Sequence, residues 1–237
     1  MVYSSYAIRV PKDIVNSDYH LILNNLDDNQ KGKVNRLRFK EDQYLSLVGQ
    51  CLIRTILCKY IGLPNKDLRF SYNYYGKPFI NNIDGKSLEF NLSHSGEWVV
   101  LAISDQPIGI DIERINLDID VTLYFNHFFS NKEQCLFSNL REQDISNYFF
   151  EFWTLKESFL KAEGTGLAIP FTSFTILKEN ELIKVLDIED KELEYSFKQY
   201  YIDKDYKLAV CGREINMEKE ITVVDYQTLF KEFKSLL

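Results

Sequence analysis

Histidine and cysteine are scarce in this chain, which has three histidines and four cysteines among 237 residues. Cys51, Cys58, Cys135 and Cys211 are scattered and form no Cys-x-x-Cys pair, so the sequence offers no zinc set. Cys51 and Cys58 are two helical turns apart, and we expect both to lie in the core. Without a disulfide pattern, we expect a reduced protein of the cytoplasm.

Long apolar runs and an excess of positive charge are also missing. No stretch approaches the roughly 18 apolar residues that span a bilayer. The N-terminus has no basic region followed by an apolar segment, so we expect neither a membrane protein nor a secretion signal. The net charge of −7 argues against a nucleic-acid binder, because phosphate backbones require a basic surface. A small anionic ligand stays compatible, since it needs only a local basic pocket.

Strand and helix patterns alternate along the chain. Apolar residues make up 45%, with 17 Phe and 15 Tyr, enough for one large domain or two of about 100 to 120 residues each. The patterns predict strands at 2–10, 68–72, 88–92, 97–104, 108–113, 173–177, 193–201 and 206–212. They predict helices over about 41–61, from near Ser130, and over about 146–163, and a last strand followed by a short helix.

The two long helices begin a faint internal repeat. The segment YLSLVGQCLIRTILCKYIGL from Tyr44 resembles YFFEFWTLKESFLKAEGTGL from Tyr148, which lies 104 residues later. Chance similarity between two amphipathic helices is one explanation, and two related halves are the other. We predict an α+β fold of two similar α/β halves, residues 1–114 and 115–237, with a ligand site at the interface between them.

The segment IGIDIERI brings two carboxylates together. Asp111 and Glu113 are two apart on a predicted strand, so both side chains leave the same face. Carboxylates this close repel each other unless a cation lies between them, and magnesium favours such ligands together with substrate phosphates. An ordinary half-exposed strand with outward acidic residues is the alternative.

The segment WTLKESFLKAEGTGL offers a third carboxylate. Glu157 and Lys161 are four residues apart and therefore share one face of a helix. They form either a surface ion pair or, because aromatic residues occur on several sides of this helix, a partly buried metal ligand with a positive charge beside it. Lys156 is expected to point elsewhere.

Three further groups are candidates for phosphate contacts. Ser93 and His94, in FNLSHSGEW, follow an apolar strand and can hold a phosphate, although a polar turn with a structural histidine has the same pattern. Lys31 and Lys33 belong to the basic stretch KGKVNRLRFK, which is either a phosphate contact or a solvated charged face. Lys77, in YYGKP, lies in a predicted turn from which its charge can reach a ligand.

Ser130 and Glu133 form the S-x-x-E pattern of a helix capping box. Capping accounts fully for Glu133, so a catalytic role there is an additional claim. A Ser-His-Asp hydrolase is not indicated, because the chain has no GxSxG nucleophile elbow.

The order of these patterns is more specific than any one of them. FNLSHS, then GIDIE, then WTLKESFLKAEGTGL resembles the phosphopantetheinyl transferase superfamily, in particular its larger, monomeric Sfp type, over nearly the whole chain. The resemblance implies two similar α+β halves with the active site between them. It also implies a magnesium-dependent enzyme that transfers 4′-phosphopantetheine from coenzyme A to a serine of an acyl or peptidyl carrier protein and releases adenosine 3′,5′-bisphosphate.

The resemblance also assigns roles to the acidic residues and one lysine. Asp111, Glu113 and Glu157 correspond to the magnesium ligands, and Lys161 to the lysine beside the transferred phosphate. Glu157 is the first candidate for the general base, directly or through a metal-bound water, and Glu133 is the second.

Contacts with coenzyme A follow in the same way. Ser93 and His94 resemble phosphate contacts, while Lys31, Lys33 and Lys77 fall where the family contacts the nucleotide end. Gln30 stands where the family often has a basic residue, so one phosphate contact is expected to be absent. The implied partners are carrier proteins and coenzyme A, without nucleic acid or membrane, and the implied state is a monomer.

Two other functions stay open at this point. A catalytically silent protein that binds coenzyme A should have lost one of the carboxylates or the lysine, and all are present. An unrelated magnesium-dependent phosphohydrolase would consume coenzyme A and leave no modified protein. Within the connection 116–129, we interpret Leu123 and Phe125 as carrier-docking residues and Phe128 and Phe129 as core.

Overall fold

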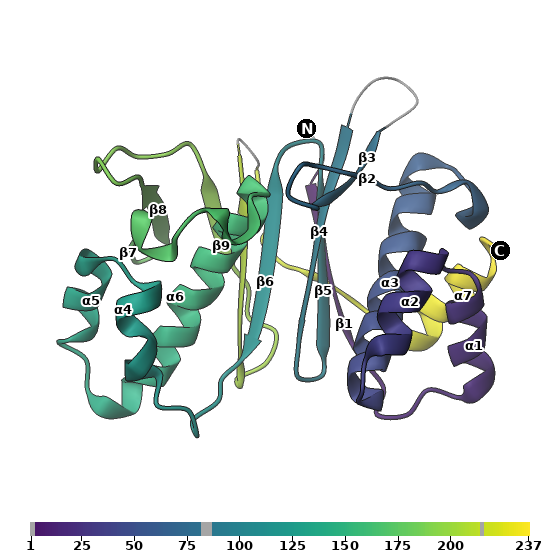
Figure 1. Ribbon diagram of the computed structural model, residues 1–237, viewed down its shortest axis with the longest axis horizontal. Helices are drawn as coiled ribbons and strands as arrows, with labels where there is room; N and C mark the ends of the chain where they lie inside the picture. The colour runs from purple at the N-terminus through teal and green to yellow at the C-terminus, as the bar shows by residue number, and fades with distance from the viewer. Residues whose placement is uncertain (1–2, 82–86, 214–215) are drawn as a thin grey trace.

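Two β-sheets pack face to face between two groups of helices, so that the molecule has four layers (Figure 1). The computed structural model describes residues 3–81, 87–213 and 216–237. Apolar side chains of β1, β5, β6 and β10 form the core between the sheets, and each sheet packs a second core against its own helices.

The first sheet has the strand order β11-β1-β5-β4-β3-β2. Its strands are β1 (Tyr3–Arg9), β2 (Ser71–Tyr72), β3 (Pro78–Asn81), β4 (Ser87–Ser95), β5 (Trp98–Ser104) and β11 (Thr222–Val224). The helices on its outer face are α1 (Asn16–Asn24), α2 (Asp28–Arg36), α3 (Lys40–Ile61) and α7 (Tyr226–Lys234). A 3₁₀ turn, η1 (Asn65–Asp67), follows α3.

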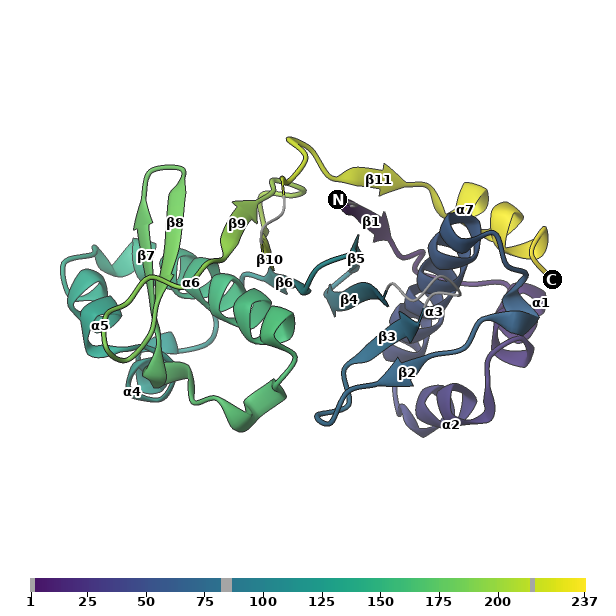
Figure 2. The same ribbon diagram turned by 90° about the horizontal axis from the view of Figure 1, so that it is seen from above.

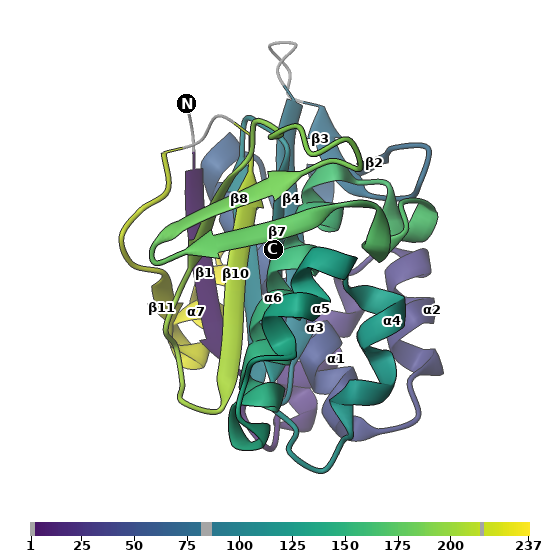
Figure 3. The same ribbon diagram turned by 90° about the vertical axis from the view of Figure 1, so that its left-hand side faces the viewer.

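The second half has a sheet in the order β6-β10-β9 and a separate hairpin, β7–β8, which crosses the direction of β10 in Figure 3. Its strands are β6 (Ile108–Arg114), β7 (Thr175–Glu179), β8 (Leu182–Leu186), β9 (Ser196–Gln199) and β10 (Tyr206–Gly212). Its helices are α4 (Phe125–Phe128), α5 (Asn131–Phe137) and α6 (Glu142–Glu163), with 3₁₀ turns η2 (Val121–Tyr124), η3 (Gly166–Ala168) and η4 (Phe171–Ser173).

The internal repeat is present in the fold. β1 pairs antiparallel with β5 over seven residues, and β6 pairs with β10 in the same way. α3 and α6 each have 22 residues and end at a left-handed glycine, Gly62 and Gly164. These glycines are 102 residues apart, two fewer than the offset read from the sequence. The predicted fold of two similar halves is confirmed.

The C-terminal segment returns to the first half (Figure 2). β11 pairs in parallel with β1, and Leu229, Phe230 and Phe233 of α7 pack into the core beneath α3. β6, in contrast, belongs to the second sheet through its pairing with β10. The division at residue 114 stays a prediction. The C-terminal segment with β11 and α7 packs with the first half although it follows residue 114, and β6 pairs within the second half although it precedes residue 115.

The interpretation of Phe125 as a docking residue stays a prediction, and its surroundings favour a role in packing. Its ring is half-buried and lies 4.8 Å from that of Phe137, 5.7 Å from that of Phe129 and 6.2 Å from that of Phe149, measured between ring centroids. Phe129 is fully buried, as expected, and Leu123 is 70% exposed. The chain turns into α4 after η2, and this turn directs Phe125 inward.

Candidate active site

The two halves meet where β4 of the first sheet lies beside β6 of the second. In the second half of β4, the alternate side chains of Asn91, Ser93 and Ser95 face β6. The Asn91 side-chain oxygen accepts the N–H of Ile110 at 2.9 Å, and the Ser95 hydroxyl oxygen accepts the N–H of Arg114 at 3.0 Å. Side chains of one sheet therefore satisfy backbone groups along the edge strand of the other.

Asp111 lies at the centre of this joint and is 2% exposed. Its Oδ1 accepts the Ser93 hydroxyl at 2.9 Å and the Lys161 ammonium at 2.5 Å, and Lys161 also donates to Ser93 Oγ at 3.1 Å. Three residues from β4, β6 and α6, far apart in sequence, thus form one contact cluster. The structure pairs Lys161 with Asp111, a contact that the helical spacing to Glu157 did not predict.

Gly109 allows α6 to come this close to β6. A Cβ atom at this position would lie 2.0 Å from the carbonyl oxygen of Ser158 and 2.4 Å from the nitrogen of Ala162. Backbone atoms of a helix cannot move aside as a flexible side chain can, so residue 109 must be glycine. The sequence signal for this contact was the glycine in IGIDIE, which sequence reasoning did not use.

The electrostatics of the cluster follow from burial and charge. Burial disfavours the charged form of Lys161, but Asp111, Glu157 and Glu113 outweigh it and raise the pKa of that ammonium. Burial, reinforced by the negative charge of Asp111, raises the pKa of Glu113 to about 7. The same two causes raise the pKa of Glu157, and Lys161 opposes the shift. The site therefore has more negative charge than Lys161 alone neutralises.

One oxygen of Asp111 marks where an additional cation fits. Oδ2 is buried and has no hydrogen-bond partner, whereas Oδ1 has two. A buried carboxylate oxygen without a partner is costly unless a ligand satisfies it. In the part of the chain that is described, no three His, Cys, Asp or Glu side chains are already gathered as metal ligands. The ligand set of Asp111, Glu113 and Glu157 thus stays a prediction, with hard oxygen donors of the kind that magnesium prefers.

Glu113 is oriented by a residue that the sequence analysis passed over. Ser95 donates its hydroxyl to Glu113 Oε2 at 2.9 Å and accepts the N–H of the next residue, Arg114. The alternation in NLSHS, in which residues 91, 93 and 95 are all polar, was the available signal.

A pocket of about 290 Å³ opens beside this cluster, between the halves. The β2–β3 turn and β4 form one wall and the end of α6 the other; its lining residues are Tyr75, Gly76, Lys77, Pro78, Asn91, Glu157, Leu160, Lys161, Gly164 and Gly166. The predicted site between the halves therefore coincides with a cavity that three candidate residues, Lys77, Glu157 and Lys161, line directly.

Three predicted phosphate contacts lie on the first half. His94 follows Ser93 on β4 and is exposed; partial burial of its ring and the positive charge of Lys161 lower its pKa. Lys31 and Lys33 lie on α2, half-buried and exposed respectively. Their roles toward coenzyme A stay predictions.

Glu133 is fully buried in the second half. Its carboxylate accepts the N–H of Ser130 and of Ile176, each at 2.7 Å, and both oxygens bind the Lys156 ammonium at 2.8 and 2.7 Å. Lys156 also donates to the carbonyl of Phe174 at 2.9 Å. The capping box is confirmed, and Lys156 points away from the pocket, as expected. This geometry favours a structural role for Glu133.

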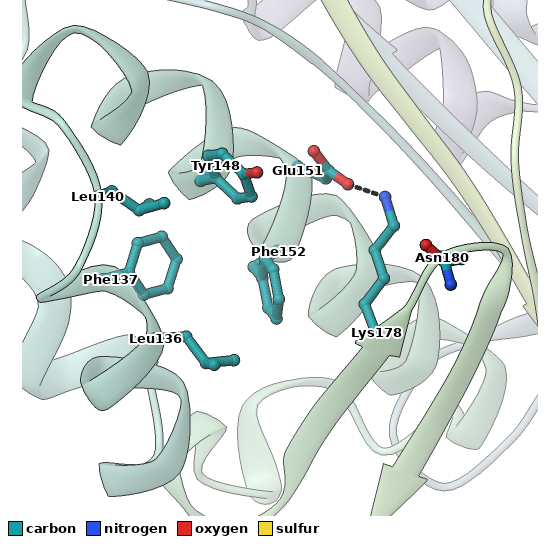
Figure 4. Close-up of a pocket in the computed structure, with 8 residues that line it drawn as sticks. All are labelled: Leu136, Phe137, Leu140, Tyr148, Glu151, Phe152, Lys178 and Asn180. Atoms are coloured by element: carbon teal, nitrogen blue, oxygen red, sulfur yellow. Dashed lines mark hydrogen bonds and ion pairs between the residues drawn. The ribbon is translucent and has the colours of Figure 1, made fainter.

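Another pocket, of about 400 Å³, lies between α5, the first turns of α6 and β7 (Figure 4). Its apolar wall is formed by Leu136, Phe137, Leu140, Tyr148 and Phe152. The two charged side chains on its lining, Glu151 and Lys178, form an ion pair with each other. Because that pair is already neutralised, this pocket is less suited to an anionic ligand than the one between the halves.

Comparison with known proteins identifies two adjoining family matches. Residues 13–106 match the model described as 4′-phosphopantetheinyl transferase, N-terminal, and residues 107–211 match the 4′-phosphopantetheinyl transferase superfamily. The border between the matches, at 106–107, falls just before β6.

Three curated relatives extend over much of the chain. The chain is 33% identical to the 4′-phosphopantetheinyl transferase Sfp of Bacillus subtilis over 94% of this chain and 98% of that protein. It is 36% identical to the transferase gsp of Aneurinibacillus migulanus, over 86% and 84%, and 32% identical to HetI of a Nostoc species, over 68% of each. Among solved structures, the holo-[acyl-carrier-protein] synthase of Thermotoga maritima covers 46% of this chain and 64% of that one, with 20% identity and a TM-score of 0.38, too weak a likeness to support an inference.

Proposed function

The chain belongs to the 4′-phosphopantetheinyl transferase superfamily and is a 4′-phosphopantetheinyl transferase, and from that premise we propose how its own residues carry out the reaction. The 4′-phosphopantetheine arm of coenzyme A moves to a serine of an acyl or peptidyl carrier protein at the joint between the halves. Adenosine 3′,5′-bisphosphate leaves.

The observation that carries this assignment is the cluster of Ser93, Asp111 and Lys161. It unites both halves at one point, beside a pocket, with a buried carboxylate oxygen that has no partner. Phosphoryl transfer needs positioning and charge neutralisation more than covalent chemistry from the enzyme. A cluster of fixed charges between two rigid sheets meets that need.

The proton and the leaving group are assigned as follows. The serine hydroxyl oxygen of the carrier bonds to the pantetheine-side phosphorus, and its proton passes to the Glu157 carboxylate, directly or through a metal-bound water. The bond from that phosphorus to the bridging pyrophosphate oxygen breaks, and the bisphosphate keeps the electron pair. Lys161 stabilises the negative charge on the phosphate oxygens. Glu133 takes no part in this scheme.

Magnesium completes the proposed site. Asp111, Glu113 and Glu157 would hold it, and when bound it supplies positive charge that neutralises the pyrophosphate oxygens. Ser93 and Ser95 hold two of these carboxylates in place through the hydrogen bonds at 2.9 Å. His94, Lys31 and Lys33 are assigned to phosphates of coenzyme A.

The remaining expectations concern state and location. Within the described ranges, no helix has both the length and the apolar character to cross a membrane. We propose a monomer that acts in the cytoplasm on carrier proteins and binds no nucleic acid.

Intact-protein mass spectrometry tests the function directly. Apo-carrier proteins are incubated with coenzyme A and this protein, with and without magnesium. The expected result is one added phosphopantetheine per carrier, only with magnesium. Consumption of coenzyme A without a modified carrier would instead identify a phosphohydrolase, and binding without either would identify a silent coenzyme A-binding protein.

A further inference from the structure

The turn between β2 and β3 reaches across the joint to the end of α6 (Figure 2). Asn73 shapes this turn, because its Oδ1 accepts the backbone N–H groups of Tyr75 at 3.0 Å and Lys77 at 2.8 Å. Its amide nitrogen donates in the other direction, to the carbonyl oxygen of Gly164 at 2.8 Å. A single side chain thus forms the turn and attaches it to a helix of the other half.

Lys77 makes the second attachment. Its side chain is 10% exposed, and its ammonium donates to the carbonyl oxygens of Ile108 at 2.9 Å and Ala162 at 3.2 Å and pairs with Glu89 at 3.3 Å. An ammonium has three N–H bonds, and these three acceptors match them. The donors of Lys77 are therefore used inside the protein.

Helix chemistry explains why the turn docks at this place. The last carbonyl groups of a helix lack partners within it, and a cation near them is favoured by the helix dipole. Asn73 and Lys77 supply both a donor and a cation to the end of α6. Gly164 leaves room for them, since a Cβ atom there would lie 2.8 Å from Lys77 Cδ and 2.9 Å from Asn73 Nδ2. At Gly62, the equivalent end of α3, a Cβ atom would meet nothing within 4 Å.

The two carbonyl groups that accept from the Lys77 ammonium belong to β6 and α6, the elements that contain Asp111 and Lys161. Ile108 begins β6, three residues before Asp111, and Ala162 directly follows Lys161 on α6. We infer that Asn73 and Lys77 form a clasp that holds β6, α6 and the first half at the spacing required by the Asp111–Lys161 contact. Both are positioning residues for the transfer reaction proposed above, and the Lys77 ammonium binds these groups of the protein instead of a phosphate of coenzyme A.

If the clasp is correct, replacing the neutral Asn73 and replacing the charged Lys77 should have the same effect. Asn73→Ala removes the bond to Gly164, and Lys77→Met removes the ammonium but keeps the chain length. Tyr74→Ala, at a 95% exposed position in the same turn, is the matched control. The measurements are kcat with an apo-carrier protein, coenzyme A affinity by calorimetry at two salt concentrations, and thermal stability.

Both clasp variants should lower kcat about 10- to 100-fold, the cost of a displacement near 1 Å. Any loss of coenzyme A affinity should be equal in Asn73→Ala and Lys77→Met, because both loosen the same turn, and the salt dependence of binding should stay close to that of the unmodified protein. The double variant should cost little more than the worse single one, because the two residues act on the same helix end. Tyr74→Ala should leave kcat unchanged.

Several results would overturn the clasp. Weaker, less salt-dependent coenzyme A binding in Lys77→Met alone would make Lys77 a phosphate contact. Lower thermal stability with unchanged kcat in both variants would make the turn purely structural. Should Lys77→Met not fold, Asn73→Asp decides, since it keeps the Oδ1 acceptor that forms the turn but loses the donor to Gly164, and it must show the same loss of kcat.

Hydrogen exchange separates this inference from the function itself. Amide exchange at residues 160–166 should accelerate in Asn73→Ala and Lys77→Met but not in Tyr74→Ala, and this needs no substrate. Unchanged exchange would overturn the clasp even if carrier modification is observed. Failure of the unmodified protein to modify any carrier would overturn the function and leave the exchange result to decide the clasp.

Discussion

The fourth residue of β1 is Tyr6, and the fourth residue of β6, its counterpart in the second half, is Asp111. Lys59 lies three residues before the glycine that ends α3, and Lys161 lies three residues before the glycine that ends α6. Tyr6 and Lys59 line one pocket of the first half, as Asp111 and Lys161 meet in the second. The same framework thus places a tyrosine and a lysine beside one pocket in the first half and an ion pair in the second.

The neighbours of the two positions explain this difference. The free edge of β1 is covered by β11, and Lys59 pairs with Glu232 of α7 at 2.6 Å. The corresponding edge of β6 meets the polar side chains of β4. The C-terminal segment therefore packs against the first half at this place, while Asp111 lies at the joint between the halves.

A second comparison concerns a buried cation on each long helix. Arg54 and Lys156 each lie eight residues before the capping glycine. Arg54 donates to Gln30 at 2.6 Å and lies over the ring of Phe70. Lys156 binds Glu133 and lies over the ring of Phe174. Gln30 and Glu133 both follow a helix-capping residue by three positions. The half without the reaction therefore has the counterpart of Glu133, which indicates that this device serves the scaffold.

The strongest test of the first comparison substitutes Asp111 and Tyr6 in two separate variants. Asp111→Ala should lower transfer at least about 10³-fold, similar to the loss of a charge that stabilises phosphoryl transfer elsewhere, while circular dichroism shows a folded protein. Tyr6→Phe, at the equivalent position, should leave transfer unchanged. Near-normal turnover of Asp111→Ala at low magnesium would contradict the metal assignment.

Glu133→Gln tests the buried ion pair between Glu133 and Lys156. Removing the charge that faces Lys156 should lower the free energy of unfolding by about 3 kcal/mol, because one charge is left buried without its partner. Urea unfolding measures this, and kcat of the folded fraction should be retained. An unchanged unfolding curve with kcat lost would restore Glu133 as a candidate base.

Phe125→Ala tests the packing of the aromatic side chains beside α6. Since Phe125 packs against three buried rings, the free energy of unfolding should fall by about 3 kcal/mol. Leu123→Ala is the matched exposed change, and it should leave stability intact and raise the Michaelis constant for the carrier. A carrier-specific kinetic effect of Phe125→Ala without loss of stability would return Phe125 to the docking surface.

His94→Ala tests whether His94 binds a phosphate of coenzyme A at the joint between the halves. If His94 contacts a phosphate, coenzyme A binding should weaken by about 1.5 to 3 kcal/mol, the range of a charge-assisted hydrogen bond. Calorimetry measures this difference. Unchanged affinity would make His94 a structural residue of β4.

Lys59→Ala is the smallest expected change and the counterpart of any change at Lys161. The exposed pair with Glu232 should contribute at most about 1 kcal/mol to the free energy of unfolding. Carrier modification should proceed at the usual rate. A marked loss of transfer would show that the first-half position also takes part in the reaction.

Several elements were predictable because their signals are local. The strand predicted at 108–113, which the structure extends by one residue to Arg114, and the capping box at Ser130 both depend on neighbours in sequence. α2 was not predicted, because DNQKGKVNR buries only Gln30 and Val34 and has little apolar periodicity. The contacts of Lys77 and Phe125 could not be predicted for another reason, since each depends on which distant element lies beside it.

The sequence by itself determined which residue types exist for the chemistry and in what order. It placed Asp111 and Glu113 on one strand face and Lys161 on one helix face, because side-chain direction follows from the periods of strand and helix. Only the tertiary structure decided that Lys161 meets Asp111 and Ser93, that Glu133 lies in the core, and that Lys77 ends between two backbone carbonyls. These contacts join residues 23 to 85 positions apart, and such contacts depend on how two sheets and their helices pack, which no local pattern specifies.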